Sequence, residues 1–440
     1  MQLQAAATGS DDHRLDLDRL VTGDRRRAAG HEQVFQHSSF AGRRGSASQR
    51  RSIADGKVCV VAVVHAVCSH GRPPYHLIRL PSRNCINGID YFPALRRTKV
   101  PESAPSTTVT GVEEALAGVD DWVANGLVPG VAAVVVDESG VLAERYAGVR
   151  ERGGEEPAGA DTLFALASLT KPLVAAACMV ALEEGLLDLD VEVRDGFTLR
   201  HLLSHCAGLP SPGMAWQEPP GYPPGTQRWY SNAGYVQAAR LLEAAAGMSC
   251  AAYLGEAVLS PLAMDASLGL PERDAARTAR VWQPGRYGEG ELFNSQRFRA
   301  DAPPQGGAFA TARAYGAFLS CLLAHGDAAG RALLAPETVD EMLAPQFGPL
   351  PGGVEGVGEW PDLCWGLGFD VRGRREPHWA GPSLGPRTAS HFGASGTLAW
   401  LDANRGLGLV ALANRGSYSG WWREPWAALG SAVTAAAAAA

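Results

Sequence analysis

Apolar residues first recur at helical spacing near residue 109. The stretch "TGVEEALAGVDDWVANG" carries them on one face, at Val112, Leu116, Val119 and Val123. Gly126 is a residue type that commonly ends such a helix. The next stretch, "VAAVVVDESGVLAERYAGV", predicts two strands around a tight Asp-Glu-Ser-Gly turn. The readable part of the chain therefore begins with a helix and an antiparallel pair of strands.

The middle of the chain has a helical pattern, and its end returns to strands. Helices are predicted over residues 168–184, 199–206, 233–246 and 311–324. Strand-like alternation follows in "CWGLGFDV", "ASHFGASGTLAWLD" and "GLGLVALANR", with a hairpin turn at 402–406 and a last helix from 421 to about 434. This order predicts an α+β fold. Strands from both ends of the chain form an antiparallel sheet flanked by helices, with a mostly helical region inserted.

Charge and tryptophan divide the chain at about residue 100. Residues 1–100 hold 16 Lys and Arg against 8 Asp and Glu, a net charge of +8, whereas the other 23 basic and 38 acidic residues give −15. All 11 tryptophans lie at Trp122 or later. Weak periodicity and clustered arginines in the first part are typical of disorder. We predict a poorly ordered basic extension over 1–105 that need not belong to the fold, one domain over 106–434 and an alanine tail over 435–440.

The composition argues against a transmembrane helix and against nucleic-acid binding. No run of 18 apolar residues occurs, so no transmembrane helix is expected. The net charge of −7 gives no nucleic-acid signature. The stretch "VCVVAVVHAVC" is apolar enough for a signal-peptide core, but it begins at residue 58, whereas secretory signals lie at the extreme N-terminus. The location in the cell stays open, with the cytoplasm favoured.

Metal and cofactor signatures are weak. The eight cysteines form no CxxC pair. His201 and His205 stand four residues apart in "HLLSH", which lacks the Glu of HExxH and an evident third ligand. There is no GxGxxG after a predicted strand, no GxxxxGK[ST] and no GxSxG before a helix. We expect no metal, no cofactor and a small-molecule substrate, and the oligomeric state stays open.

One lysine indicates a candidate catalytic site. After residue 100 every basic residue is Arg or His except Lys171. It follows Ser168 by three residues at a predicted helix start, so the two side chains share one face. A serine hydroxyl needs a neighbour that takes its proton, which a desolvated lysine can do and arginine cannot. The pair is a candidate nucleophile and base, and the alternative is an ordinary surface lysine beside a serine.

Two later motifs complete an ordered set. "WYSNAGY" holds Tyr230 and Asn232 before a helix, and "SHFGASGT" holds His391 and Gly393 on a predicted strand. Together with "SLTK", these motifs resemble the serine β-lactamase/penicillin-binding-protein-like hydrolase family, in particular its class C β-lactamase and esterase branch. The hallmarks of that family are S-x-x-K, Y-x-N, and K-T-G or H-x-G, in this order. The resemblance covers about residues 109–415 and includes "TLRHLLSHCAGLP" and "PQGGAFAT".

The resemblance implies catalysis through an acyl-enzyme. Ser168 matches the nucleophile and Lys171 the lysine that helps to deprotonate it. Tyr230 matches the tyrosine that acts as general base, as phenolate or through a shared proton, and then as acid. A tyrosine does this when nearby positive charge lowers its pKa, and Lys171 is expected to supply that charge. The backbone N–H groups of Ser168 and Ala394 match the oxyanion hole.

Three further positions match substrate-binding residues of the family. Asn232 corresponds to the amide that contacts the acyl side chain and Lys171, and Gly393 permits close approach of substrate to the strand. Standing alone, Tyr230 and His391 would also suit core packing, and Asn232 a helix N-cap. His391 replaces the lysine that helps to hold the carboxylate of β-lactams and cell-wall peptides, and an imidazole is mostly neutral at pH 7.

The resulting prediction is a serine hydrolase that acts on small acyl substrates. An esterase or amide hydrolase is favoured, because a neutral imidazole holds a carboxylate poorly. A β-lactamase or D-Ala-D-Ala-type peptidase is the alternative within the same chemistry. A catalytically silent relative that binds a ligand is the alternative from another class, against which the intact Ser168, Lys171 and Tyr230 argue.

Overall fold

A computed structural model describes residues 47–54, 57–64, 107–209, 220–284, 291–327, 330 and 332–439 of the 440-residue chain. The chain divides into two units, of which the smaller is Asp24–Glu102. Its described part is an antiparallel hairpin of β1 (Ala47–Ala54) and β2 (Lys57–Val64). The rest of the proposed extension lies outside the described residues, so its disorder stays a prediction.

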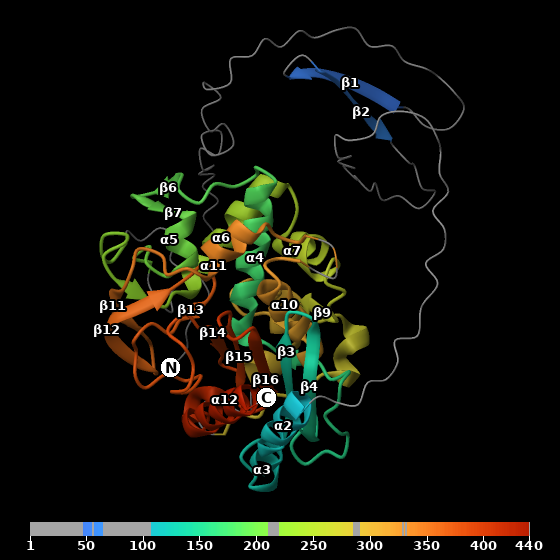
Figure 1. The fold of residues 1–440 in the computed structure, drawn as a ribbon, viewed down its shortest axis with the longest axis vertical. Helices are drawn as coiled ribbons and strands as arrows, with labels where there is room; N and C mark the ends of the chain where they lie inside the picture. The colour runs from blue at the N-terminus through green and yellow to red at the C-terminus, as the bar shows by residue number, and fades with distance from the viewer. Residues whose placement is uncertain are drawn as a thin grey trace, which may run out of the picture. The chain divides into compact units, whose positions relative to one another are not determined.

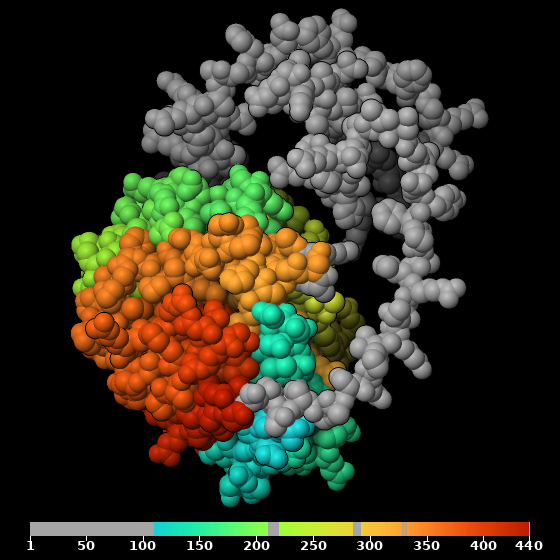
Figure 2. All heavy atoms as spheres, viewed as in Figure 1, coloured from blue at the N-terminus to red at the C-terminus, as the bar shows by residue number. Residues whose placement is uncertain are grey.

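The larger unit is built on a nine-stranded sheet in the order β4-β3-β16-β15-β14-β13-β12-β11-β8. Five strands come from the two ends of this unit: β3 (Gly130–Asp137), β4 (Gly140–Gly148), β14 (Ala389–Gly393), β15 (Thr397–Asp402) and β16 (Leu407–Ala413). Strands β3 and β16 pair antiparallel at the centre of this group. On the face shown in Figure 2, residues coloured cyan to green adjoin the red C-terminal residues. The predicted α+β sheet made from both ends is confirmed (Figure 1).

Strand β3 shows why its sequence is a continuous apolar run. Ala132, Val134 and Val136 pack into one hydrophobic core, and the alternate residues between them pack into a second core. Helix α10 (Ala312–Leu323) contacts the sheet at β3, while α2 (Thr107–Leu116) packs against α12 (Arg423–Ala438) and β4. A strand covered on both faces needs apolar residues at every position, because neither face meets water.

The inserted region supplies the remaining elements. Its helices are α4 (Thr170–Glu183), α5 (Leu199–Leu203), α6 (Asn232–Ala246), α7 (Cys250–Leu254), α8 (Glu291–Asn294), α9 (Gln296–Asp301) and α11 (Pro336–Leu343). Shorter helical turns cover Ala167–Leu169, Gly255–Leu259 and Glu272–Arg277, and a further turn outside this region, Ser417–Ser419, follows β16. Small sheets join β5 (Phe164–Ala165), β10 (Ala308–Ala310) and β9 (Ala266–Leu268), and β6 (Glu192–Arg194) with β7 (Phe197–Thr198). None of the described helices combines the length and apolar character needed to span a bilayer.

Four sequence predictions need correction. The first helix is divided into α2 and α3 (Gly118–Ala124). "CWGLGFDV" is not one strand: it turns between β12 (Gly358–Trp365) and β13 (Asp370–Val371), which pair with each other, and Gly368 adopts φ 96° in the turn. Helix α12 runs into the alanine tail, since alanine is the strongest helix former. Strands β11 (Leu350–Val354) and β8 (Arg228–Trp229), which pair in parallel, were not predicted.

Candidate active site

Ser168 lies in the short helical turn Ala167–Leu169 that leads into α4. The residue before it, Ala167, adopts φ 46°, in the left-handed region that side chains rarely occupy. The hydroxyl of Thr397 donates to the carbonyl oxygen of Leu166 at 2.9 Å and so ties this turn to strand β15. The nucleophile candidate therefore stands on a strained turn that the central sheet holds in place.

Gly393 is required by close packing against the same turn. A Cβ at this position would lie 2.2 Å from the carbonyl oxygen of Leu166 and 2.3 Å from the hydroxyl of Thr397. Both distances are far below van der Waals contact. The glycine predicted from the H-x-G motif thus allows strand β14 to approach the nucleophile turn, in addition to any role toward a substrate.

The structure places Lys171 beside Ser168, as the sequence spacing predicts. Its Nζ atom lies 3.0 Å from Oγ of Ser168, 2.9 Å from Oδ1 of Asn232 and 2.6 Å from the carbonyl oxygen of Gln305. The side chain is fully buried, and this burial holds its pKa well below the usual value of 10.5. A surface lysine is therefore excluded, and the neutral amine is the favoured form.

The three contacts of Lys171 assign the direction of each hydrogen bond. A neutral amine has two N–H donors and one lone pair. The carbonyl oxygens of Asn232 and Gln305 can only accept, so they take both donors. In this neutral form the lone pair would accept from the hydroxyl of Ser168, the one partner able to donate, whereas the ammonium form would donate to that hydroxyl.

Tyr230 closes the site on the other side of Lys171. The lysine Nζ atom lies 4.8 Å from the centroid of the tyrosine ring. The phenol oxygen is buried, and in the described part of the chain it has no partner in hydrogen-bond geometry. Burial raises the pKa of Tyr230, and the nearby Ser168 hydroxyl opposes this effect. The expectation that Lys171 would lower this pKa is wrong, because burial raises the pKa of Tyr230 and also disfavours the charged form of Lys171.

His391 is buried on strand β14 and faces Tyr230, with the two ring centroids 5.8 Å apart. Its Nδ1–H donates to the carbonyl oxygen of Phe392 at 2.8 Å, which leaves Nε2 unprotonated. Nε2 is buried and has no partner among the described residues. Burial lowers the pKa of His391 to about 3. The imidazole is therefore neutral and offers an acceptor rather than a cation.

Asn232 and Ala394 lie where the motifs place them. Asn232 is the first residue of α6, and Ser231 before it caps the helix by accepting from the N–H of Gly234 at 3.1 Å. The carbonyl oxygen of Ala394 accepts from the N–H of Ser417 at 2.9 Å, which fixes the orientation of its peptide. No described backbone carbonyl accepts from the N–H of Ala394. That N–H is available for the predicted oxyanion hole.

His205 is a site residue that the sequence analysis missed. Its ring lies 4.4 Å from that of Tyr230, and its Nδ1 accepts from the N–H of Ser231 at 3.0 Å. The two histidines of "HLLSH", which are spaced like a pair of metal ligands, have different partners in the structure. His201 accepts from the N–H of Thr198 and caps α5, whereas His205 packs behind the catalytic tyrosine candidate. The available signal was the position of His205 in "TLRHLLSHCAGLP", a stretch that resembles the family.

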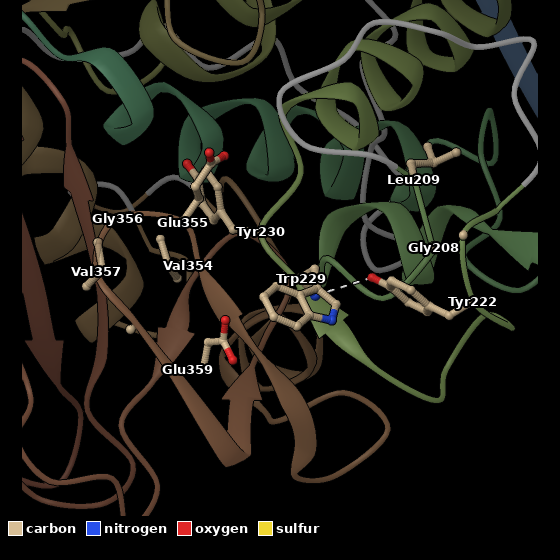
Figure 3. A pocket seen from close by; sticks show the side chains of 13 residues that line it. Gly208, Leu209, Tyr222, Trp229, Tyr230, Val354, Glu355, Gly356, Val357 and Glu359 are labelled. Atoms are coloured by element: carbon tan, nitrogen blue, oxygen red, sulfur yellow. Dashed lines mark hydrogen bonds between the residues drawn. The ribbon is translucent and has the colours of Figure 1, made fainter.

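A cavity of about 740 Å³ opens beside Tyr230. Its described walls come from residues 208–209 and 221–222, from the end of β8 and from the turn between β11 and β12. Figure 3 shows Trp229 and Tyr222 on one side and Glu355 and Glu359 on the other. The tyrosine therefore stands between the Ser168–Lys171 pair and a space large enough for a small acyl substrate.

The site combines a serine and a lysine at a helix start, a tyrosine from the inserted region and an H-x-G strand. This arrangement is similar to that of penicillin-binding-protein-like hydrolases. A family model described as Beta-lactamase matches residues 119–429. The chain belongs to this beta-lactamase family.

Individual relatives agree with that family. Penicillin-binding protein 4* of Bacillus subtilis is 30% identical over 164 residues, 30% of this chain and 36% of its own length. Esterase EstB of Burkholderia gladioli is 37% identical over 95 residues, 18% of this chain and 24% of its own length. The chain thus spans about a third or less of these two relatives. The crystal structure of a beta-lactamase from Mycobacterium bovis is 32% identical, with a TM-score of 0.57, and covers 72% of this chain and 98% of its own.

Proposed function

We propose that this protein is an esterase or amide hydrolase that forms an acyl-enzyme on Ser168. One observation carries the proposal: Nζ of the fully buried Lys171 lies 3.0 Å from Oγ of Ser168, while the carbonyl oxygens of Asn232 and Gln305 accept from the same amine. This arrangement suits direct proton transfer from serine to lysine. The similarity to esterase EstB supports the same chemistry.

In the proposed reaction, Oγ of Ser168 attacks the acyl carbonyl carbon, and its proton passes to Nζ of Lys171. The N–H groups of Ser168 and Ala394 stabilise the oxyanion of the tetrahedral intermediate. When the intermediate collapses, the leaving group takes the proton of the Tyr230 hydroxyl, which the Lys171 ammonium replaces. Water then attacks the acyl carbon by the reverse sequence, which releases the acid and restores Ser168.

The protonated state of Tyr230 fits the role of proton donor. Because burial raises its pKa, the phenol keeps its proton over the whole neutral range. Its hydroxyl has no partner in the described structure, so it is free to meet a leaving-group oxygen or nitrogen. A general acid must be protonated when the leaving group departs, and this residue meets that requirement.

His391 favours esters and amides over β-lactams. A substrate carboxylate in this position would meet the unprotonated Nε2 of a neutral ring instead of a cation. Losing a charge-assisted hydrogen bond costs about 1.5–3 kcal/mol, or roughly 10- to 150-fold in rate or affinity. That loss shifts substrate preference without removing acylation, which depends on Ser168 and Lys171.

Labelling with a fluorophosphonate probe tests the nucleophile. The native protein is expected to be labelled and to hydrolyse p-nitrophenyl butyrate, and Ser168→Ala to lose both activities. Ser139→Ala, in the exposed turn between β3 and β4, is the matched control and is expected to retain both. Labelling that persists in Ser168→Ala would reject the assignment, and a native protein that is never labelled would favour the silent ligand-binding relative.

The substrate preference is tested with p-nitrophenyl butyrate and nitrocefin at pH 7.5. The ester is expected to turn over faster, and His391→Lys is expected to narrow the gap by improving nitrocefin turnover. A native preference for nitrocefin, or an unchanged ratio in His391→Lys, would show that this position does not set the substrate class.

A further inference from the structure

The cavity beside Tyr230 carries a distinctive combination of side chains. One wall is aromatic, from Trp229 and Tyr222, and the rim holds the two carboxylates Glu355 and Glu359. Among the described residues that line it, none is Lys, Arg or His. The cavity is therefore negative at its rim and rich in aromatic faces.

Both carboxylates lack a counter-ion in the part of the chain that the structure describes. Glu355 and Glu359 are exposed residues that flank the turn between β11 and β12, and neither joins an ion pair with a described residue. Arg423 reaches this turn, but its guanidinium donates to the carbonyl oxygen of Val357 and lies over the Trp422 ring. It does not line the cavity.

The aromatic wall is held in position by the neighbouring strands. The N–H of Trp229 donates to the hydroxyl of Tyr222 at 3.3 Å, and the indole N–H donates to the Gln227 side chain at 2.9 Å. The indole also packs on β11, where a Cβ at Gly353 would lie 3.2 Å from the ring. Aromatic faces combined with carboxylates are the groups that attract ammonium ions in proteins.

Tyr230 connects this cavity to the proposed catalytic groups, since it lines the cavity and its ring centroid lies 4.8 Å from Nζ of Lys171. Tyr230 lines the cavity, and its hydroxyl is buried near Ser168 without a partner in hydrogen-bond geometry among the described residues. Buried polar groups are normally satisfied, so a hydroxyl without a well-formed hydrogen bond is a group that the reacting end of a substrate would meet. A ligand in the cavity thus lies next to the proposed proton donor.

We propose that this cavity is a subsite for an ammonium group, and that the substrates are esters or amides with a cationic amine near the scissile bond. The proposal rests on the hydrolase function proposed above and specifies its substrate class. The cation lies against the Trp229 face, and Glu355 and Glu359 balance its charge. The neutral His391 agrees with this preference, since nothing in the described site provides a cation for an anionic substrate.

The test compares choline with 3,3-dimethylbutan-1-ol, which has the same shape and no charge. Both are measured as competitive inhibitors of p-nitrophenyl butyrate hydrolysis, and by calorimetric binding to the Ser168→Ala protein. A cation–π contact and partly exposed charge pairs predict that choline binds roughly tenfold more tightly than its neutral counterpart. Because the carboxylates are exposed, the difference should shrink at high salt.

Variants locate the effect. The double variant Glu355→Gln/Glu359→Gln is expected to reduce the choline preference to about twofold or less, which leaves the aromatic contribution. The matched control is Glu113→Gln/Glu114→Gln on α2, which removes the same charge from exposed positions that do not line the cavity. The control is expected to keep the full preference.

The outcomes separate the two proposals. Equal binding of choline and the neutral alcohol by the native protein, or a full native preference in the Glu355→Gln/Glu359→Gln protein, overturns the ammonium subsite. If esters are hydrolysed by Ser168 without any choline preference, only the subsite is wrong. If Ser168→Ala binds choline selectively while the native protein hydrolyses no ester, the subsite stands and the hydrolase proposal fails.

Discussion

Replacing His391 by asparagine should change how the stability of the protein depends on pH. The imidazole is buried, and its pKa is lowered from 6.5 to about 3. Between these two values the unfolded chain binds a proton at this residue and the folded chain does not. Proton binding to the unfolded state lowers the free energy of unfolding, so His391 makes the protein less stable as the pH falls below 6.5.

The size of the effect follows from the pKa difference. A pH of 4.5 lies two pH units below the ordinary histidine pKa of 6.5. Each unit of proton binding by the unfolded chain lowers the free energy of unfolding by about 1.4 kcal/mol, so His391 alone lowers it by about 3 kcal/mol at this pH. Asparagine does not titrate, and its amide can still donate to the Phe392 carbonyl oxygen that Nδ1 contacts. The loss of stability between pH 7.5 and 4.5 should therefore be about 3 kcal/mol smaller in His391→Asn.

Urea unfolding at the two pH values measures this difference. The comparison of two pH values within each protein cancels any fixed cost of the substitution, and the other buried histidines contribute equally to both proteins. His325→Asn is the control, because the side chain of His325 is 65% exposed, and it should show the native pH dependence. If native protein and His391→Asn lose the same stability, the imidazole accepts a proton in the folded state and its burial does not keep it neutral.

Three further predictions concern the nucleophile, its supporting strand and the extension. Lys171→Arg should fold by circular dichroism but lose at least about 100-fold in acylation rate, since arginine cannot release its proton; near-native turnover would leave lysine a purely electrostatic role. Gly393→Ala should cost about 1–3 kcal/mol in urea unfolding and reduce the rate constant kcat, because its Cβ would overlap the Leu166 carbonyl oxygen, whereas Gly118→Ala has open space and should not destabilise. A chain that begins at residue 101 should keep the native melting temperature, and a large drop would show that the extension belongs to the fold.

The nucleophile and base were predictable because their contact is local. Ser168 and Lys171 are three residues apart at a helix start, so the helix alone brings their side chains together. The patterns of apolar residues likewise predicted β3 and most of α6, because each pattern lies within one short stretch of the sequence. Tyr230 and His391 had no such local signal and came from the resemblance of their motifs to a family.

Contacts between distant segments were decided by the tertiary structure. The carbonyl of Gln305, which completes the surroundings of Lys171, lies 134 residues further along the chain. Backbone carbonyls are present at every residue, so no sequence pattern marks the one that will be used. His205 and the parallel pairing of β8 with β11 were missed for the same reason, since both depend on partners far away in the sequence.

The sequence by itself determined which chemical groups are present and which local elements carry them. Their protonation states were decided by burial, which no stretch of sequence shows, because a pKa depends on how much solvent the whole fold removes from a group. The resemblance implied that Tyr230 acts as phenolate or through a shared proton beside a charged Lys171, whereas burial raises the pKa of Tyr230 and lowers that of Lys171, which favours the neutral form of each. The cavity charge also arose only on folding, when the turn between β11 and β12 placed Glu355 and Glu359 opposite Trp229.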